Sequence, residues 1–167
     1  DYPQLKQQPS PAGQRRGLYI GCTVPSKGTA WLEELIDLTP EAHWGHIGPG
    51  RVTGALDHSY VPLETDYGRH LVSQYDLLVM PGANDANPTT VLEAVAWGLI
   101  PVCRATCGWE EPVVRLLSDD HVEAAQQIHH LLWCEDLSAY SAGARALIAE
   151  PYTWQRFCAP ILEELTC

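Results

Sequence analysis

The chain has 167 residues, 46% of them apolar, which suits one ordinary α/β domain with a buried core and excludes a disordered chain. Its 10 Lys and Arg are outnumbered by 21 Asp and Glu, and the net charge of −11 argues against nucleic-acid and membrane-surface partners. No apolar run is long enough to span a bilayer, and the N-terminus lacks the apolar stretch of a signal peptide. We therefore expect a soluble, cytoplasmic protein without a membrane span.

The first 16 residues, DYPQLKQQPSPAGQRR, are rich in proline and glutamine and show no apolar periodicity. They predict a linker or tail, followed by one ordered domain over residues 17–167. Because the chain begins with Asp inside such a stretch, we expect it to be a piece of a longer protein.

Apolar runs and helical periodicity then alternate along the chain. Apolar runs predict strands at 17–21, 43–48, 76–81 and 99–105, with a weaker strand within 55–61. Helical periodicity predicts helices at 28–38, 67–75 and 88–98. Beyond Trp109 the pattern predicts helices alone: one after Ser118–Asp120, one at 137–150 and one at 152–165.

Continuously apolar strands that alternate with helices predict an α/β fold, a Rossmann-like, doubly wound parallel sheet closed by C-terminal helices. Ligands of such sheets bind beyond the carboxyl ends of the strands. This rule selects the loop 22–27 after the first strand and the loop 82–87 after the strand DLLVMP.

The cysteines and histidines predict no metal site. The six cysteines are scattered, and the one close pair, Cys103 and Cys107, has no spacing typical of zinc or redox motifs. Reduced thiols packed as small apolar side chains are expected instead. The seven histidines show no metal-ligand or triad spacing, and His129 and His130 are expected on a helix surface or in packing. No cofactor is expected either.

The segment after Asn87 begins a helix with an anion-binding end. Asn87 is a favoured N-cap and Pro88 a favoured first helical residue. The free N–H groups near Thr89 and Thr90 would face the crevice, where a helix N-terminus with two hydroxyls suits a phosphate. The alternative is a cap that only stabilises the helix, by about 1 kcal/mol.

Two carboxylates flank this helix end. Glu93 lies on a helix that is apolar on nearly every face, so its charge needs a partner or a polar ligand. Asp85 precedes the helix in the loop. Carboxylates that accept from hydroxyls, beside a helix end that holds phosphate, suit a nucleotide-sugar. The alternative for Glu93 is an internal ion pair with Arg104 or Arg115.

Lys27 adds a cation at the start of the first predicted helix, where a positive charge opposes the helix dipole unless an anion is bound there. The alternative is an ordinary surface lysine, at a local cost of about 0.3–1 kcal/mol.

These segments resemble the group 1 (family 4) retaining glycosyltransferases of the GT-B fold. GCTVPSKG at 21–28 is similar to their G-R-L-x-x-x-K-G loop, and DANPTTVLEAVAWGLIPV at 85–102 is similar to their signature of two acids separated by seven residues. YTW at 152–154 resembles the start of their closing helix.

The resemblance implies the C-terminal, donor-binding half of such an enzyme, which would bind a UDP- or GDP-sugar and transfer a hexose with retention. It implies that Asp85 contacts the donor sugar, that Asn87 to Thr90 meet the sugar and diphosphate, that Glu93 binds the ribose and that Lys27 binds phosphate. The acceptor site and the catalytic histidine would lie in a missing N-terminal half, so this chain alone would bind but not transfer.

Two departures leave other functions open. Cys22 stands where the family has an arginine that assists the lysine, and Asp85 is one methylene shorter than the usual glutamate. A non-catalytic binding or assembly module with the same fold is the main alternative. An unrelated flavodoxin-like ligand-binding domain is a third, which the block NPTTVLEA at 87–94 disfavours.

Overall fold

The computed structural model describes residues 6–82, 89–109, 114–133 and 135–137. The described strands form one six-stranded, all-parallel sheet in the order β3-β2-β1-β4-β5-β6. The strands are β1 (Arg16–Ile20), β2 (His43–Ile47), β3 (Leu56–Asp57), β4 (Leu77–Met80), β5 (Ile100–Arg104) and β6 (Arg115–Leu117). The helices are α1 (Thr29–Asp37), α2 (Asp66–Ser73), α3 (Thr90–Trp97) and α4 (His121–Trp133), with 3₁₀ turns at Pro25–Lys27 and Ala105–Cys107.

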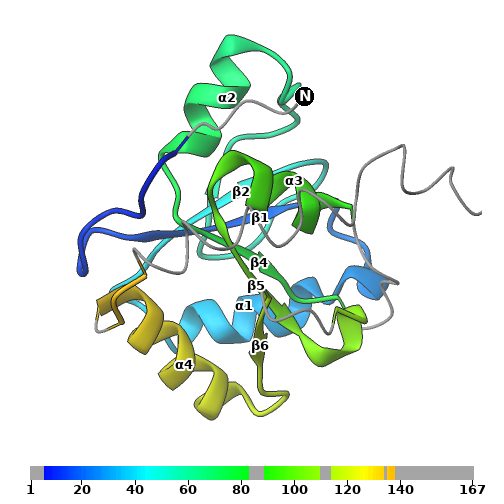
Figure 1. The fold of residues 1–167 in the computed structure, drawn as a ribbon. Coiled ribbons are helices and arrows are strands. Elements are labelled where there is room, and N and C mark those ends of the chain that lie inside the picture. Colours follow the sequence, from blue (N-terminus) through cyan, green and yellow to red (C-terminus); the bar gives the residue numbers. More distant parts are fainter. Residues whose placement is uncertain (1–5, 83–88, 110–113, 134, 138–167) are drawn as a thin grey trace, which may run out of the picture.

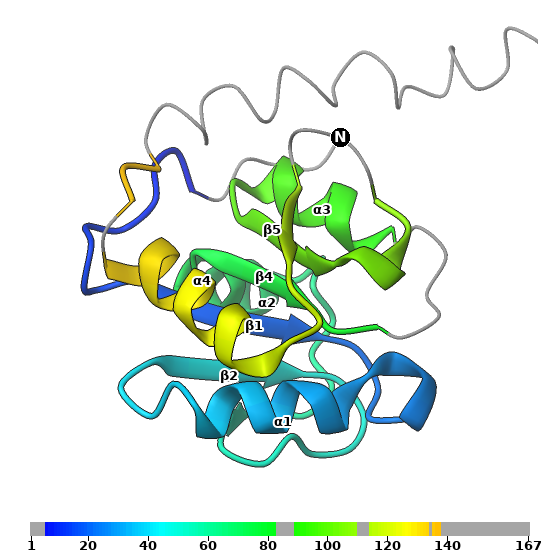
Figure 2. The same cartoon turned by 90° about the horizontal axis from the view of Figure 1, so that it is seen from below.

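Helices cover both faces of the sheet, α2 and α3 on one side and α1 and α4 on the other (Figures 1 and 2). Successive side chains of a strand therefore enter two different cores. Leu18 packs with α2 and α3, whereas its neighbour Tyr19 packs with α1 and α4. This burial on both faces explains why the strands are continuously apolar in sequence, and it confirms the predicted Rossmann-like fold.

The C-terminal part corrects one prediction. The sequence predicts only helices after Trp109, but Arg115–Leu117 forms the edge strand β6, parallel to β5 with Val102 opposite Arg115. Three residues of sequence Arg-Leu-Leu carry no periodicity, and pairing with β5 decides their conformation. The predicted helix after Ser118–Asp120 is confirmed as α4. The predicted helices at 137–150 and 152–165 fall almost wholly outside the described residues.

The segment before β1 lies against the sheet and α4, without helix or strand of its own between Lys6 and Arg15. The buried carboxylate of Asp76 accepts from the backbone N–H groups of Ser10 (2.6 Å) and Arg16 (3.0 Å) and forms an ion pair with Lys6 at 2.6 Å. Arg15 donates to the carbonyl oxygens of Leu131 and Glu135. The part of the predicted linker that is described is thus bonded to the sheet and to the end of α4.

Among the described residues, no helix combines the length and the apolar character that crossing a membrane requires.

Candidate functional site

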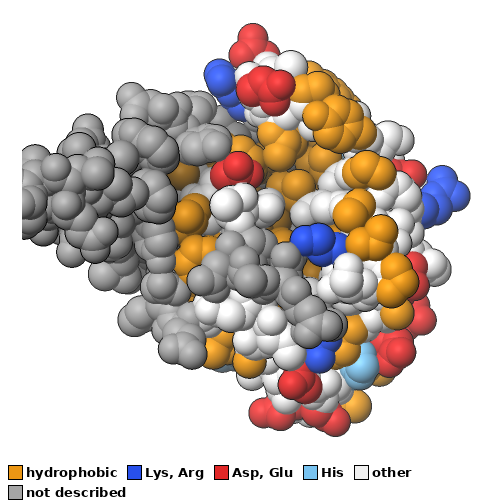
Figure 3. Space-filling view, turned by 90° about the vertical axis from the view of Figure 1, so that its right-hand side faces the viewer, with side chains coloured by type: hydrophobic (Ala, Val, Ile, Leu, Met, Phe, Trp, Pro, Cys, Tyr) orange, Lys and Arg blue, Asp and Glu red, His pale blue; other side chains and the backbone are white. Residues whose placement is uncertain are grey.

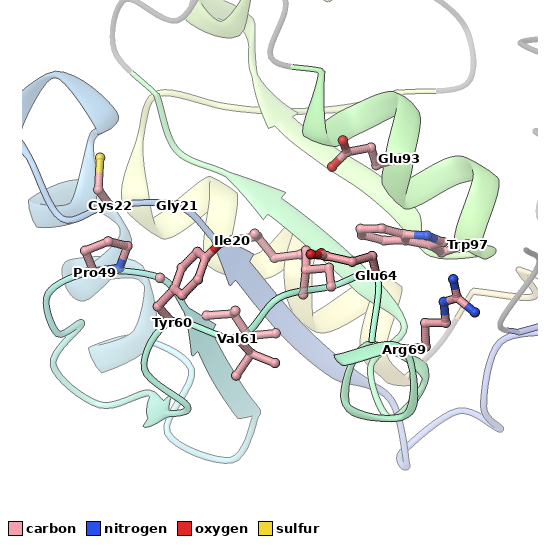
Figure 4. A pocket seen from close by; sticks show the side chains of 13 residues that line it. Ile20, Gly21, Cys22, Pro49, Tyr60, Val61, Glu64, Arg69, Glu93 and Trp97 are labelled. Atoms are coloured by element: carbon pink, nitrogen blue, oxygen red, sulfur yellow. The ribbon is translucent and has the colours of Figure 1, made fainter. Parts of the chain in front are cut away.

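A cavity of about 670 Å³ opens beyond the carboxyl ends of β1 and β2 and reaches the helices α2 and α3 (Figure 4). Its lining residues come from the turns after β1 and β2, the segment after β3, and the two helices. They are Ile20, Gly21, Cys22, Ile47, Gly48, Pro49, Tyr60, Val61, Leu63, Glu64, Arg69, Glu93 and Trp97. The strand order reverses direction between β1 and β4, so the cavity adjoins the place where doubly wound sheets bind ligands.

The two loops selected from the sequence meet at Gly28. This glycine has a left-handed backbone, φ +70°, and a Cβ at this position would overlap the carbonyl oxygen of Pro81 at the exit of β4. Only glycine allows both the conformation and the close approach. The loop that carries Lys27 is therefore held against the start of the loop after β4.

Lys27 lies in the 3₁₀ turn Pro25–Lys27 and is half-buried. Gly28, in its left-handed conformation, separates it from the first residue of α1. The charge of Lys27 thus lies just before the amino end of α1 and not on its first turn. Lys27 therefore directly precedes the N-cap of α1, on the loop that Gly28 holds beside the exit of β4.

Side chains of β1 and β2 fix the backbone of the loop that carries Cys22. Tyr19 donates its hydroxyl to the carbonyl oxygen of Cys22 at 2.9 Å, and Nε2 of His46 lies 2.8 Å from the carbonyl oxygen of Gly21. The two rings stack with their centroids 5.4 Å apart. The turn after β1 is therefore held in place on the cavity wall, with the half-buried side chain of Cys22 lining the cavity.

Glu93 lines the cavity from α3 and is half-buried, whereas Val91, Ala94 and Val95 on the same helix are buried. The two arginines considered as its internal partners have other acids beside them. Arg104 pairs with Asp119 at 2.6 Å, and Arg115 pairs with Glu135.

The amino end of α3 is partly described. The backbone N–H of Glu93 donates to the carbonyl oxygen of Thr89, which occupies the N-cap position without a side-chain capping hydrogen bond, and Thr90 is the first residue of the helix. Thr89 is exposed and Thr90 half-buried. Asp85 and Asn87 lie outside the described residues, so their predicted positions at the helix end remain predictions.

The opposite wall of the cavity was not singled out from the sequence. Tyr60 and Val61 follow the two-residue strand β3, Glu64 precedes α2, and Arg69 lies on it. The one local signal was Thr65, whose Oγ1 accepts from the backbone N–H of Gly68 at 3.1 Å and caps α2. A capped helix after a weak strand predicts a loop at the edge of the sheet. It does not predict that this loop turns toward the cavity.

Two titratable groups near β3 have shifted pKa values. Burial lowers the pKa of His58 below 6.5, partly opposed by the nearby Asp57 carboxylate, and its Nε2 lies 2.7 Å from the hydroxyl of Tyr75. The backbone N–H of Ser59 lowers the pKa of Asp57. Within the described segments, no group of three or more potential metal ligands occurs.

Neither a protein-family model nor a curated protein matches the chain. Solved structures do. TarM matches with a TM-score of 0.71 and 16% identity over 94% of this chain and 35% of that one. Sucrose-phosphate synthase from Thermosynechococcus elongatus matches with 0.73 and 16%, over 94% of this chain and 46% of that one. HepE from Anabaena, solved in complex with UDP and glucose, matches with 0.69 and 15%, over 92% of this chain and 48% of that one.

The chain therefore spans between about a third and a half of the length of these solved structures. At these low identities the likeness concerns the fold. Together with the strand order and the helices on both faces, it identifies the chain as having the Rossmann-like fold of one half of a GT-B glycosyltransferase.

Proposed function

We propose that this chain is the donor-binding half of a retaining glycosyltransferase, which transfers a hexose from a nucleoside diphosphate sugar to an acceptor. The observation that carries the proposal is the cavity at the carboxyl ends of β1 and β2, with the carboxylate of Glu93 on one wall. A carboxylate in a partly apolar cavity suits the two hydroxyls of a ribose, which can both donate to it.

The other roles follow from the resemblance to the group 1 glycosyltransferases. Lys27 and the free N–H groups at the start of α3, with Thr89 and Thr90, would hold the diphosphate. Asp85 would orient the donor sugar, and Asn87 would contact the sugar and diphosphate. The complex of HepE with UDP and glucose supports a ligand of this class, because its fold matches this chain.

Transfer also needs an acceptor site and a catalytic group, which we place in a further half of the whole protein. The face that carries the loops after β1 and β2 supports this (Figure 3), because hydrophobic side chains gather there and Tyr60 is 72% exposed. On this account, the present chain binds the donor but transfers no sugar by itself.

A non-catalytic binding or assembly module is the second candidate, and Cys22 favours it. The resemblance implies an arginine on the diphosphate at this position, and the cysteine leaves that contact unmade. Donor binding distinguishes the two candidates, since a module that has lost donor chemistry would bind no nucleotide.

Thermal unfolding in the presence of UDP, GDP, ADP and their sugar conjugates tests the proposal. A nucleotide at about 100 times its Kd adds roughly 2.7 kcal/mol to the free energy of unfolding, which is a shift of several degrees for a domain of this size. Glu93→Gln should remove most of the shift, because an amide accepts fewer hydrogen bonds than a carboxylate. Glu41→Gln, exposed at the amino end of β2, is the matched control and should retain it. Folded protein that shifts with none of these ligands would overturn the proposal.

A further inference from the structure

The spacing along α3 gives the order in which a nucleotide would meet the cavity wall. Thr90 begins the helix, Glu93 follows about 4.5 Å along the axis, and Trp97 a further 6 Å along it. Glu93 and Trp97 are four residues apart, on one face of the helix, and both line the cavity. If the diphosphate lies at the helix start and the ribose on Glu93, the base lies beside Trp97.

The end of the cavity at Trp97 carries the charges available to recognise a base. Figure 4 shows Cys22 and Pro49 at one end of the cavity and Arg69 and Trp97 at the other, with the carboxylate of Glu64 in the middle, directed toward Ile20. Arg69 supplies the single guanidinium among the described lining residues, and it is half-buried. The indole of Trp97 is only 4% exposed and forms a fixed apolar wall.

Arg69 and Glu64 form no ion pair within 4.0 Å with each other or with any other described residue, although both reach the same cavity. Their donors and acceptors are therefore available to a ligand. Because they do not neutralise one another, a base bound at this end of the cavity would meet donors from Arg69 and an acceptor from Glu64.

We infer that Arg69 and Glu64 read the base of the bound nucleotide and select guanine; this inference rests on the proposed function. Guanine presents two acceptors, O6 and N7, which match the paired N–H groups of an arginine. Its N1–H and exocyclic amino group are donors on the adjoining edge, which match a carboxylate. This base satisfies both side chains at once.

With each of the other common bases, one of these two side chains meets a group of its own hydrogen-bonding kind. Adenine carries an amino group where guanine has O6, so the donors of Arg69 would meet a donor. Uracil has a carbonyl oxygen on each side of its N3–H, so the carboxylate of Glu64 would meet an acceptor beside the donor. Guanine nucleotides should therefore bind this chain more tightly than uridine or adenine nucleotides.

Calorimetric titration with GDP, UDP and ADP tests this order on the chain as it stands. We expect GDP to bind about tenfold or more tightly than either of the others, the discrimination typical of one good bidentate contact. Arg69→Gln should remove most of this preference, while Glu41→Gln, exposed and far from the cavity, should leave it unchanged.

Two analogues of GDP distinguish the contribution of Glu64 to binding from that of Arg69. Inosine diphosphate lacks the exocyclic amino group, so it should bind more weakly than GDP to the wild type, and this difference should shrink in Glu64→Gln, whose single amide oxygen is an uncharged and weaker acceptor. The 7-deaza analogue of GDP lacks the N7 acceptor, so its loss of affinity should disappear in Arg69→Gln. Circular dichroism of both variants checks that these partly exposed positions leave the fold intact.

The inference and the proposed function fail in different ways. Binding of UDP or ADP as tight as that of GDP, still dependent on Glu93, would overturn guanine selection and leave donor binding standing. A GDP preference that survives both Arg69→Gln and Glu64→Gln would also overturn the inference. Absence of binding by all three diphosphates would overturn the proposed function itself.

Discussion

The half-buried side chain of Cys22 lines the cavity at the turn after β1, on a backbone fixed by Tyr19 and His46. The glycosyltransferases that the sequence resembles carry an arginine at this point. Because the backbone is held in place, a longer side chain here should extend into the cavity rather than move the loop. The residue is thus suited to a gain-of-binding test.

We predict that Cys22→Arg raises the affinity for nucleoside diphosphates about tenfold, since a hydrogen bond to a charged group contributes about 1.5–3 kcal/mol. The gain should be absent for the free nucleoside, which has no phosphate. Cys22→Ser is the matched control and should bind as the wild type does. Calorimetry measures the affinity of the wild type and of both variants for the diphosphate and for the free nucleoside. An equal gain for the nucleoside would contradict a phosphate contact at this position.

His58 makes stability depend on pH. Burial lowers its pKa in the folded protein below 6.5, so the unfolded chain takes up this proton more readily. The free energy of unfolding that depends on neutral His58 is fully present above pH 6.5. It is lost as the pH falls through 6.5 toward the pKa of His58 in the folded protein.

We expect the urea midpoint to fall between about pH 7.5 and pH 5 by less in His58→Gln than in the wild type. His43→Gln, at the exposed start of β2, is the control and should behave as the wild type. An unchanged pH dependence in His58→Gln would contradict this assignment.

At the scale of the elements, Gly28 couples the loop after β1 to the exit of β4. Gly28→Ala should lower the free energy of unfolding by about 2 kcal/mol more than Gly13→Ala. Both glycines have a left-handed backbone, at φ +70° and +82°, but a Cβ at Gly13 would make only an ordinary 3.5 Å contact with Trp133. Equal losses in chemical unfolding would show that the close approach to Pro81 contributes nothing.

The sequence predicts most of these elements because burial has a clear pattern. DLLVMP reads as a strand because every residue of β4 is buried. The sequence does not predict the strand Arg115–Leu117, because a three-residue edge strand depends on its neighbour β5 and not on its own composition.

One wall of the candidate site can be predicted from the sequence, and the opposite wall cannot. Glu93 is marked by its position on a helix that is apolar on nearly every face. Glu64 and Arg69 are not, because the fold brings their segment to the cavity after the two-residue strand β3, and only the tertiary structure supplies that direction.

At the scale of the whole molecule, the segment before β1 is part of the folded unit, held through Asp76. Asp76→Ala should lower the free energy of unfolding by about 3 kcal/mol, because it leaves Lys6 and two backbone N–H groups without their buried acceptor. Asp37→Ala, exposed at the end of α1, should change it by less than about 0.5 kcal/mol. Urea unfolding measures both, and similar midpoints would contradict a docked segment.

The proposed function requires that this half of a GT-B fold binds a nucleoside diphosphate across the carboxyl edge of its sheet. A crystal structure of the chain with GDP tests it most directly. We expect the diphosphate beside Lys27 and the start of α3, the ribose hydroxyls on Glu93, and the base in contact with Glu64 and Arg69. A nucleotide bound elsewhere on the molecule, or in this cavity with its ribose away from Glu93, would contradict it.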